Sequence, residues 1–161
     1  MGGVTLEYSP TLYLAAEFPT APYTSMPPRG EDWTVSPSLH IDLRIARSTR
    51  ANLFLVGADP LVSNALRVVV PDLNHGTVIR RRGGRLLLPP ASSRLGTVVV
   101  HDVDTLTPDD QYGLLDWMDA VQYRTQVVST TSAPMLMRVE AGAFNDTLYY
   151  RLNKIYVDLS E

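Results

Sequence analysis

Two patterns of apolar residues alternate along most of the chain. Short continuous apolar runs have the length and character of strands that are buried on both faces of a sheet. They are separated by longer segments in which apolar residues recur every three or four positions, as on one face of a helix. The expected strands are residues 52–57, 96–103, 125–131 and 154–159.

Four segments around these runs are expected to be helical. The clearest is 107–122, where Thr107 is followed by Pro108 and by acidic residues, a sequence typical of a helix start. Gly142 is expected to break the last of the four. The segments are 38–49, 60–70, 107–122 and 134–152, with Ser36 or Ser38 as the cap of the first. Their expected core residues include Leu39, Leu43, Ala46, Leu114, Leu115, Trp117 and Met118.

Residues 76–90 are expected to form a small β-element around the turn at Gly83 and Gly84. Strands that alternate with helices along a chain are typical of a parallel sheet with helices packed on it. The expected fold class is therefore α/β. In such sheets ligands bind at the carboxyl ends of the strands, so the residues that follow each strand are the candidate site.

The first 37 residues differ from the rest of the chain. They hold six of the twelve prolines, and proline fixes φ and lacks the backbone donor that helices and central strands need. We therefore divide the chain into a Pro-rich N-terminal arm or linker, 1–37, and an α/β domain, 38–161. Residues 11–18 have the character of a short element within the arm, but a partly ordered tail is the interpretation that we favour.

Composition narrows the class of protein. The chain has no cysteine, which excludes disulfides and thiolate metal sites and is typical of cytoplasmic proteins. Its net charge of −3 argues against a surface that coats nucleic acid. It has no apolar run of the length of a membrane span and no basic-then-apolar start. We expect a cytoplasmic protein that does not associate with a membrane.

The stretch "GAFNDTLYYRLNKIYVDL" (142–159) resembles the end of the sigma-54 interaction domain, the AAA+ ATPase module of bacterial enhancer-binding proteins. That family has Gly-x-Phe-Arg-x-Asp-Leu-Tyr-Tyr-Arg-Leu-Asn there, followed by an apolar strand. Earlier segments are similar in order and spacing to its first strand with phosphate loop (51–69), its Walker B strand and next helix (96–119) and its sensor strand (126–132). The resemblance covers residues 39–159 and implies a parallel-sheet, P-loop NTPase-like (AAA+) α/β core, here without the family's helical lid.

The nucleotide site implied by this resemblance lacks its phosphate loop. Such a loop needs glycines, whose backbone amides converge on the phosphates, and then a lysine and a serine or threonine. The corresponding stretch, "GADPLVSN", keeps Gly57, but Pro60 and Val62 replace two loop glycines and Ser63 stands at the lysine position. The only lysine of the chain is Lys154, so a shifted alignment does not restore the motif.

The other catalytic positions of the family are also altered. Its Walker B strand ends in Asp-Glu, which hold Mg²⁺ and polarise the attacking water, whereas this chain has His101 and Asp102. Mg²⁺ prefers oxygen ligands, and aspartate is one methylene shorter than glutamate. The family's sensor asparagine corresponds to Ser132. Of its two arginines that act across subunits, the first corresponds to Asn145 and the second to Arg151.

Five arginines form the one basic concentration of the sequence. They stand in the region where the family has the Gly-Ala-Phe-Thr-Gly-Ala loop that contacts sigma-54, which this chain lacks. The group is a candidate interaction patch for an acidic protein face, a phosphate or nucleic acid; a solvated hairpin with arginines on its turn is the simpler interpretation. No aromatic residues interleave with it, which argues against single-strand binding. The patch is Arg80, Arg81, Arg82, Arg85 and Arg94.

Other candidate chemistry is weaker. His75, His101, Asp102 and Asp104 are of types that bind metal ions, but no ligand spacing organises them. No Gly-x-Ser-x-Gly elbow occurs that would organise a hydrolase triad. We therefore expect no metal site and no catalytic residue.

The resulting hypothesis is a catalytically inactive sigma-54-interaction-like domain, a pseudo-ATPase that acts by protein contacts in bacterial transcription regulation or signalling. We expect a protein partner, no cofactor and no direct binding of nucleic acid. Two alternatives stay open: an ATP-binding sigma-54-type regulator with an atypical pocket, for which ATP and Mg²⁺ would be ligands, and a module that binds another small ligand. The remnant pocket is Gly57, Ser63, Asp102, Ser132 and Arg151.

Overall fold

The structure of the protein is a computed structural model, and it describes residues 37–70, 77–80, 86–93 and 95–160. The proposed N-terminal arm lies outside these residues except for Pro37, and so do Arg81, Arg82, Arg85 and Arg94 of the candidate patch. The elements are α1 (Pro37–Thr49), β1 (Leu53–Val56), α2 (Asp59–Val69), β2 (Thr77–Arg80), β3 (Thr97–His101), η2 (Val103–Thr105), α3 (Pro108–Val121), η3 (Gln122–Arg124), β4 (Gln126–Thr131), α4 (Met135–Glu140), α5 (Asp146–Leu152) and β5 (Ile155–Asp158).

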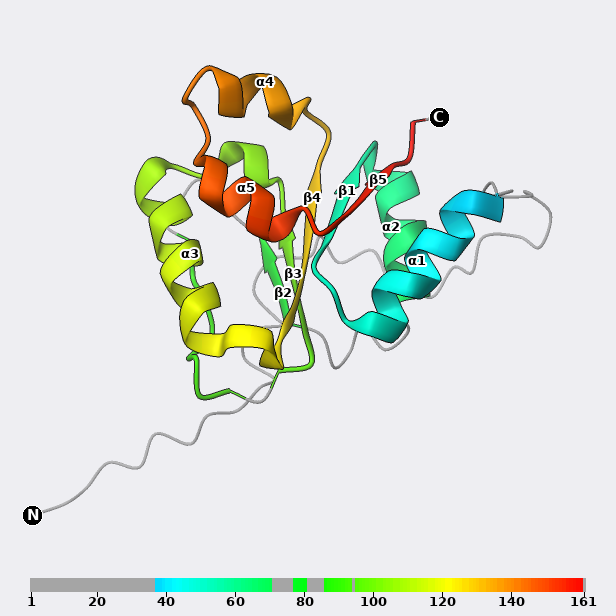
Figure 1. Ribbon diagram of the computed structural model, residues 1–161, viewed down its shortest axis with the longest axis horizontal. Helices are drawn as coiled ribbons and strands as arrows, with labels where there is room; N and C mark the ends of the chain where they lie inside the picture. The colour runs from blue at the N-terminus through cyan, green and yellow to red at the C-terminus, as the bar shows by residue number, and fades with distance from the viewer. Residues whose placement is uncertain (1–36, 71–76, 81–85, 94, 161) are drawn as a thin grey trace, which may run out of the picture. The chain divides into compact units, whose positions relative to one another are not determined.

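Five parallel strands form one sheet, in the order β2-β3-β4-β1-β5. Helices α1 and α2 cover one face of it, and α3 and α5 cover the other (Figure 1). A parallel connection has to return to the starting edge of the sheet, and the helices between the strands provide these returns. The predicted α/β class is therefore confirmed, together with the four strands and the helical segments that the apolar patterns indicate.

The core has two layers because side chains on a strand alternate between the faces of the sheet. In β1, Phe54 packs with the layer under α3 and α5, whereas Leu53 and Leu55 pack with the layer under α1 and α2. All three side chains are fully buried. The continuous apolar runs in the sequence thus reflect burial on both faces of the sheet.

Helix α3 begins as its sequence predicts. The amide of Asp110 donates to the Thr107 hydroxyl oxygen at 3.3 Å, and the Asp110 carboxylate accepts from the backbone amide of Thr107, which completes a capping box. The same carboxylate also accepts the amide of Leu86 at 2.9 Å. Asp110 is buried, so one aspartate both starts α3 and attaches the preceding loop to it.

The β-element expected around the two adjacent glycines is not a hairpin in the described residues. Strand β2 pairs in parallel with β3, and residues 86–90 form no strand. That segment lies along α3 instead, where the Trp117 indole donates to the carbonyl of Pro89 at 2.7 Å. The expected β-element is therefore confirmed in β2 alone: the Leu86 amide and the Pro89 carbonyl bond to side chains of α3 rather than to β2, and Gly83 and Gly84 lie outside the described residues.

The sequence also predicts a break near Gly142 and a cap for the first helix. The break near Gly142 is confirmed: α4 ends at Glu140, and Gly142 has a φ of 68°, in the left-handed region that glycine adopts without strain. Ser38 is the second residue of α1, so it is not the residue that caps it. Ser36, the other candidate cap, lies outside the described residues.

Candidate functional site

The carboxyl ends of the central strands meet at one edge of the sheet, where α/β proteins bind ligands. Gly57 follows β1, Asp102 follows β3 and Ser132 follows β4. The amide of Gly57 donates to the carbonyl of Thr131 at 3.0 Å, which holds the ends of β1 and β4 together. Three of the five residues predicted for the remnant pocket therefore share this edge.

The connection between β1 and α2 is very short. Helix α2 begins at Asp59, with Ala58 in an extended conformation as its N-cap. The amides of Leu61 and Val62 both donate to the carbonyl of Ala58, each at 3.0 Å. In a phosphate loop, successive amides in this region point at the ligand. Here two of them are already bonded within the first turn of the helix.

The residues at the start of α2 also have the wrong charge for phosphate. A helix N-terminus attracts anions, but exposed Asp59 occupies the first turn of α2 with a carboxylate of its own. Pro60 has no backbone donor. Ser63, at the lysine position of the family, lies more than one turn inside the helix and is half-buried.

Gly57 has a structural role that requires no ligand. Its φ of 156° lies in a region that side-chain-bearing residues rarely adopt, and a Cβ atom there would lie 2.9 Å from the Cβ of Leu159. The amide of Leu159 donates to the carbonyl of Val56 at 2.8 Å. The close packing of the ends of β1 and β5 therefore suffices to explain the glycine.

The end of β3 is organised by hydrogen bonds within the protein. The Nδ1 atom of His101 lies 3.0 Å from the hydroxyl oxygen of Thr130 in β4. The backbone of Asp102 has a left-handed conformation, with a φ of 53°. Its carbonyl accepts hydrogen bonds from both the amide and the hydroxyl of Thr105, at 2.9 and 2.8 Å. The backbone of Asp102 thus builds the turn η2 after the strand.

Thr131 and Asp104 form a contact that sequence reasoning missed. The Thr131 hydroxyl donates to Asp104 Oδ1 at 2.7 Å and accepts the amide of Ala133 at 3.0 Å. Thr131 is buried, whereas Ser132, the residue predicted for the sensor position, is exposed. Strand alternation in β4 could have indicated the burial of Thr131, since it lies on the same face as Val127 and Ser129.

These polar residues do not form a metal site in the described part of the chain, where no group of three or more histidine, cysteine, aspartate or glutamate residues is placed to hold an ion. His75, one of the four metal-type residues of the sequence, lies outside that part. Asp158, at the end of β5, accepts hydrogen bonds from the hydroxyl and the amide of Ser160, and these lower the pKa of its carboxyl from its usual value.

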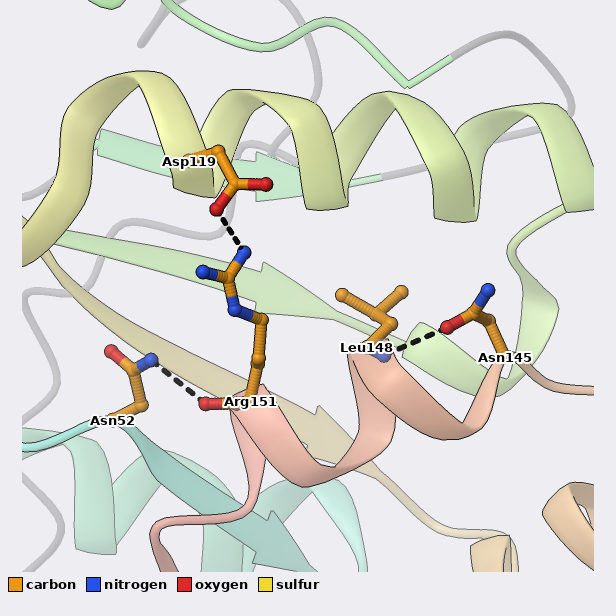
Figure 2. Close-up of polar contacts among 5 residues, drawn as sticks. All are labelled: Asn52, Asp119, Asn145, Leu148 and Arg151. Carbon is orange, nitrogen blue, oxygen red and sulfur yellow. Dashed lines mark hydrogen bonds and ion pairs between the residues drawn. The ribbon is translucent and has the colours of Figure 1, made fainter.

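Arg151 lies near the amino end of β1, whereas Gly57 and Asp102 follow the carboxyl ends of their strands. Its carbonyl accepts the side-chain amide of Asn52, the residue just before β1, at 2.9 Å. Its guanidinium pairs with Asp119 on α3 at 2.5 Å (Figure 2). Within its own chain, Arg151 therefore joins α5 to β1 and α3 and is not close to the other remnant-pocket residues.

Asn145 has a structural role as well. Its side chain accepts the amide of Leu148 at 2.8 Å and so caps α5 (Figure 2). Its own amide donates to the side-chain oxygen of Gln111 on α3 at 2.7 Å. Helix α5 is thus attached to α3 at its start by Asn145 and near its end by Arg151.

Part of the chain matches a known family. Residues 88–161 match the family model of the sigma-54 interaction domain. This segment belongs to the sigma-54 interaction domain family. A comparison with the curated proteins gives no match.

Solved structures are similar in fold to a larger part of the chain. NtrX from Brucella abortus, in complex with ATP, has a TM-score of 0.57 at 14% identity over 76% of this chain. The P-loop NTPase domain of the sigma-54 transport activator from E. coli has a TM-score of 0.50 at 16% identity over 73% of this chain and 96% of its own. At this identity the likeness shows the fold, a P-loop NTPase-like α/β core. The chain spans 36% of the length of NtrX.

Two further findings concern the membrane and the candidate arginine patch. No helix in the described part of the chain combines the length and apolar character that a membrane span requires. Of the candidate arginine patch, the backbone of Arg80 is described as the last residue of β2, and the other four arginines lie outside the described residues.

Replacement of Arg151 by alanine is expected to lower the free energy of unfolding of the domain by up to about 1 kcal/mol, because the ion pair with Asp119 is partly exposed. Asp119→Ala should cost a similar amount, and the double variant should cost less than the sum of the two. A double-mutant cycle by urea unfolding measures this coupling. Strictly additive losses would show that the pair contributes nothing.

Proposed function

We propose that this sigma-54 interaction domain acts through protein contacts in sigma-54-type transcription control and neither binds nor hydrolyses Mg-ATP. The family match supports the setting. The main support for the loss of nucleotide binding is the short connection between β1 and α2, whose amides already bond within the helix.

The first turn of α2 would have to open before a triphosphate could bind in the usual way. The amides of Leu61 and Val62 would have to leave the carbonyl of Ala58, and the carboxylate of Asp59 would then face the phosphates. No lysine follows in this helix to offset that repulsion, since Lys154 is the only lysine of the chain. Breaking existing helix bonds and placing like charges together both oppose binding.

The catalytic positions after β3 and β4 support the same proposal. The imidazole of His101 contacts Thr130, and Asp104 accepts the hydroxyl of Thr131. Attack on a γ-phosphate needs a carboxylate that holds Mg²⁺ and another that orients water. Here one of the two family positions is His101, whose side chain is an imidazole. The carboxylate of Asp104 already accepts a hydrogen bond from Thr131 of β4.

The partner contacts are proposed to differ from those of active relatives. The sequence lacks the Gly-Ala-Phe-Thr-Gly-Ala loop through which the family contacts sigma-54. NtrX has been solved with ATP and with ADP, and we propose that this chain shares the fold of that protein without the ligand. The domain would then contribute a surface to an assembly, with no cycle of nucleotide hydrolysis.

The test is the thermal stability of the full chain with and without millimolar Mg-ATP, Mg-ADP and a non-hydrolysable analogue. A ligand at about 100 times its Kd adds about 2.7 kcal/mol to the folded state, or roughly 5–10 °C for a domain of this size. We expect no shift, while NtrX from Brucella abortus under the same conditions serves as the positive control.

A clear Mg-dependent shift would overturn the proposal and favour an ATP-binding regulator with an atypical pocket. In that case Asp59→Asn should increase the shift, because it removes a negative charge from the start of α2. A shift that Asp59→Asn leaves unchanged would place the nucleotide elsewhere on the domain.

A further inference from the structure

Two large apolar side chains of α4 point away from the core. The helix is attached to the domain by Met135, which is buried, and by Val139, which packs against the same core layer. Leu136 and Met137, in contrast, are 52% and 68% exposed. Two of the six residues of α4 therefore present apolar side chains to solvent and belong to neither layer of the core.

The turn after α4 extends this apolar surface with small residues. The amides of Ala143 and Phe144 donate to the carbonyl of Arg138, at 2.8 and 3.1 Å, and close the turn over the end of the helix. Ala141, Gly142 and Ala143 are all exposed. A Cβ atom built at Gly142 meets nothing within 4 Å, so another chain can approach the backbone closely here. We call this surface the α4 patch: Leu136, Met137, Ala141, Gly142 and Ala143.

Carboxylates lie at both ends of the α4 patch. Glu140 is the last residue of α4, and Asp146 is the first residue of α5; both are exposed. Asp104 lies near the start of α4, because the Thr131 hydroxyl that donates to Asp104 also accepts the amide of Ala133. The apolar surface is thus bordered by three acidic side chains.

We infer that the α4 patch binds a segment of another protein that is both apolar and basic, in the manner of an amphipathic helix. Exposed apolar residues with a polar border are typical of protein-binding surfaces, and methionine adapts its shape to a partner. The three carboxylates outnumber Arg138, the single cation of residues 132–146. They favour a partner with lysine or arginine beside its apolar residues, and they oppose nucleic acid and anionic lipid.

This inference rests on the proposed function, because it names the surface through which the domain would act by protein contacts. The patch follows β4, whereas the altered nucleotide loop lies between β1 and α2 (Figure 1). The two proposals can therefore fail separately. A Mg-dependent shift with ATP would overturn the loss of nucleotide binding and leave the α4 patch intact. A patch that binds no peptide would overturn this inference alone.

The probe that tests the inference is a synthetic amphipathic peptide of leucine and lysine, about 14 residues long. Its control has glutamate in place of lysine. The full chain is isotope-labelled at the methyl groups of its five methionines, so that NMR resolves Met137 from Met118, which is buried in the core layer under α3. We expect the lysine peptide, at up to about 100 μM, to change the Met137 signal and not the Met118 signal. The glutamate peptide should change neither. An unchanged Met137 signal with the lysine peptide would overturn the inference.

Serine variants locate the contact. Leu136→Ser and Met137→Ser each remove an apolar side chain from the patch and should weaken binding of the lysine peptide about fivefold, as measured by fluorescence anisotropy. Leu87→Ser is the matched control, since Leu87 is 67% exposed but precedes α3, and its affinity should equal that of the wild type. All three positions are exposed, so the midpoint of thermal unfolding should change by less than about 3 °C. Equal affinities of the three variants would place the peptide elsewhere and overturn the inference.

A charge reversal and two further controls test the class of partner. Glu140→Lys should weaken binding of the lysine peptide about tenfold and allow the glutamate peptide to bind; unchanged preference for lysine would overturn the basic partner. A Met137 signal that responds to phosphatidylcholine vesicles but not to the peptide would identify a membrane surface instead. A Met137 signal that changes with the concentration of the chain alone would identify a second copy as the occupant. Either of these results would overturn the inference.

Discussion

Replacing Phe54 with alanine is expected to lower the free energy of unfolding by about 3–5 kcal/mol, the range for truncating a large aromatic side chain in a core. Phe54 is fully buried in the central strand β1. Its ring meets Tyr149 edge-on, with centroids 5.8 Å apart, and stacks on Tyr156 at 6.3 Å. The substitution removes both ring contacts and leaves a cavity between the sheet and α5. Urea unfolding of the full chain measures the loss.

Tyr156→Ala is the matched control for this prediction. It removes a ring from the same cluster, but Tyr156 is 48% exposed, so the loss should be less than half as large. Because a domain has only about 5–15 kcal/mol of stability, Phe54→Ala should leave a marginal fold. A cost below about 1 kcal/mol would show that the cluster around Phe54 is not the centre of the core.

Replacing Gly57 with alanine is expected to cost about 2–4 kcal/mol of unfolding free energy. The added Cβ would lie 2.9 Å from the Cβ of Leu159, which cannot move aside because it is attached directly to the backbone. The φ of 156° adds backbone strain for any residue with a side chain. The loss should be the same with and without Mg-ATP.

Gly113→Ala is the control for this prediction, since it adds the same methyl group where nothing lies within 4 Å. It should raise the free energy of unfolding by up to about 1 kcal/mol. If Gly57→Ala left stability unchanged within about 0.5 kcal/mol, the packing against Leu159 would not be the reason for this glycine.

The strands and helices could be predicted because burial determines where apolar residues occur in each element. Strands that are covered on both faces are rich in continuous apolar residues, and β1 and β3 show this pattern. Strand β4 is equally buried, but only Val127 and Val128 of its six residues are apolar. Helix α3 carries its own start signal in Thr107 and Pro108. Strand β2 lies within the predicted β-element, but its parallel pairing could not be predicted because its partner, β3, is distant in sequence.

The polar contacts could not be predicted, since they depend on which side chains the fold brings together. Gln126 donates to the carbonyls of Ala46 and Ala51, at 2.9 and 2.7 Å, and so fastens the end of α1 to β4. Nothing in its neighbourhood in the sequence indicates this. Thr131 is a partial exception, because strand alternation places it on the same face of β4 as Val127 and Ser129. The roles of Arg151 and Asn145 within the chain likewise appeared only with the positions of α3 and β1.

The short turn from β1 into α2 means that no single substitution would create a phosphate loop at this position. A single Ser63→Lys change would place a lysine in the second turn of a finished helix, where the amides of Leu61 and Val62 still bond to Ala58. Replacing Pro60 or Val62 with glycine would weaken that helix without supplying the lysine. Each of these changes alone costs stability or supplies no group for a phosphate, so several would be needed together to build a phosphate loop at this turn.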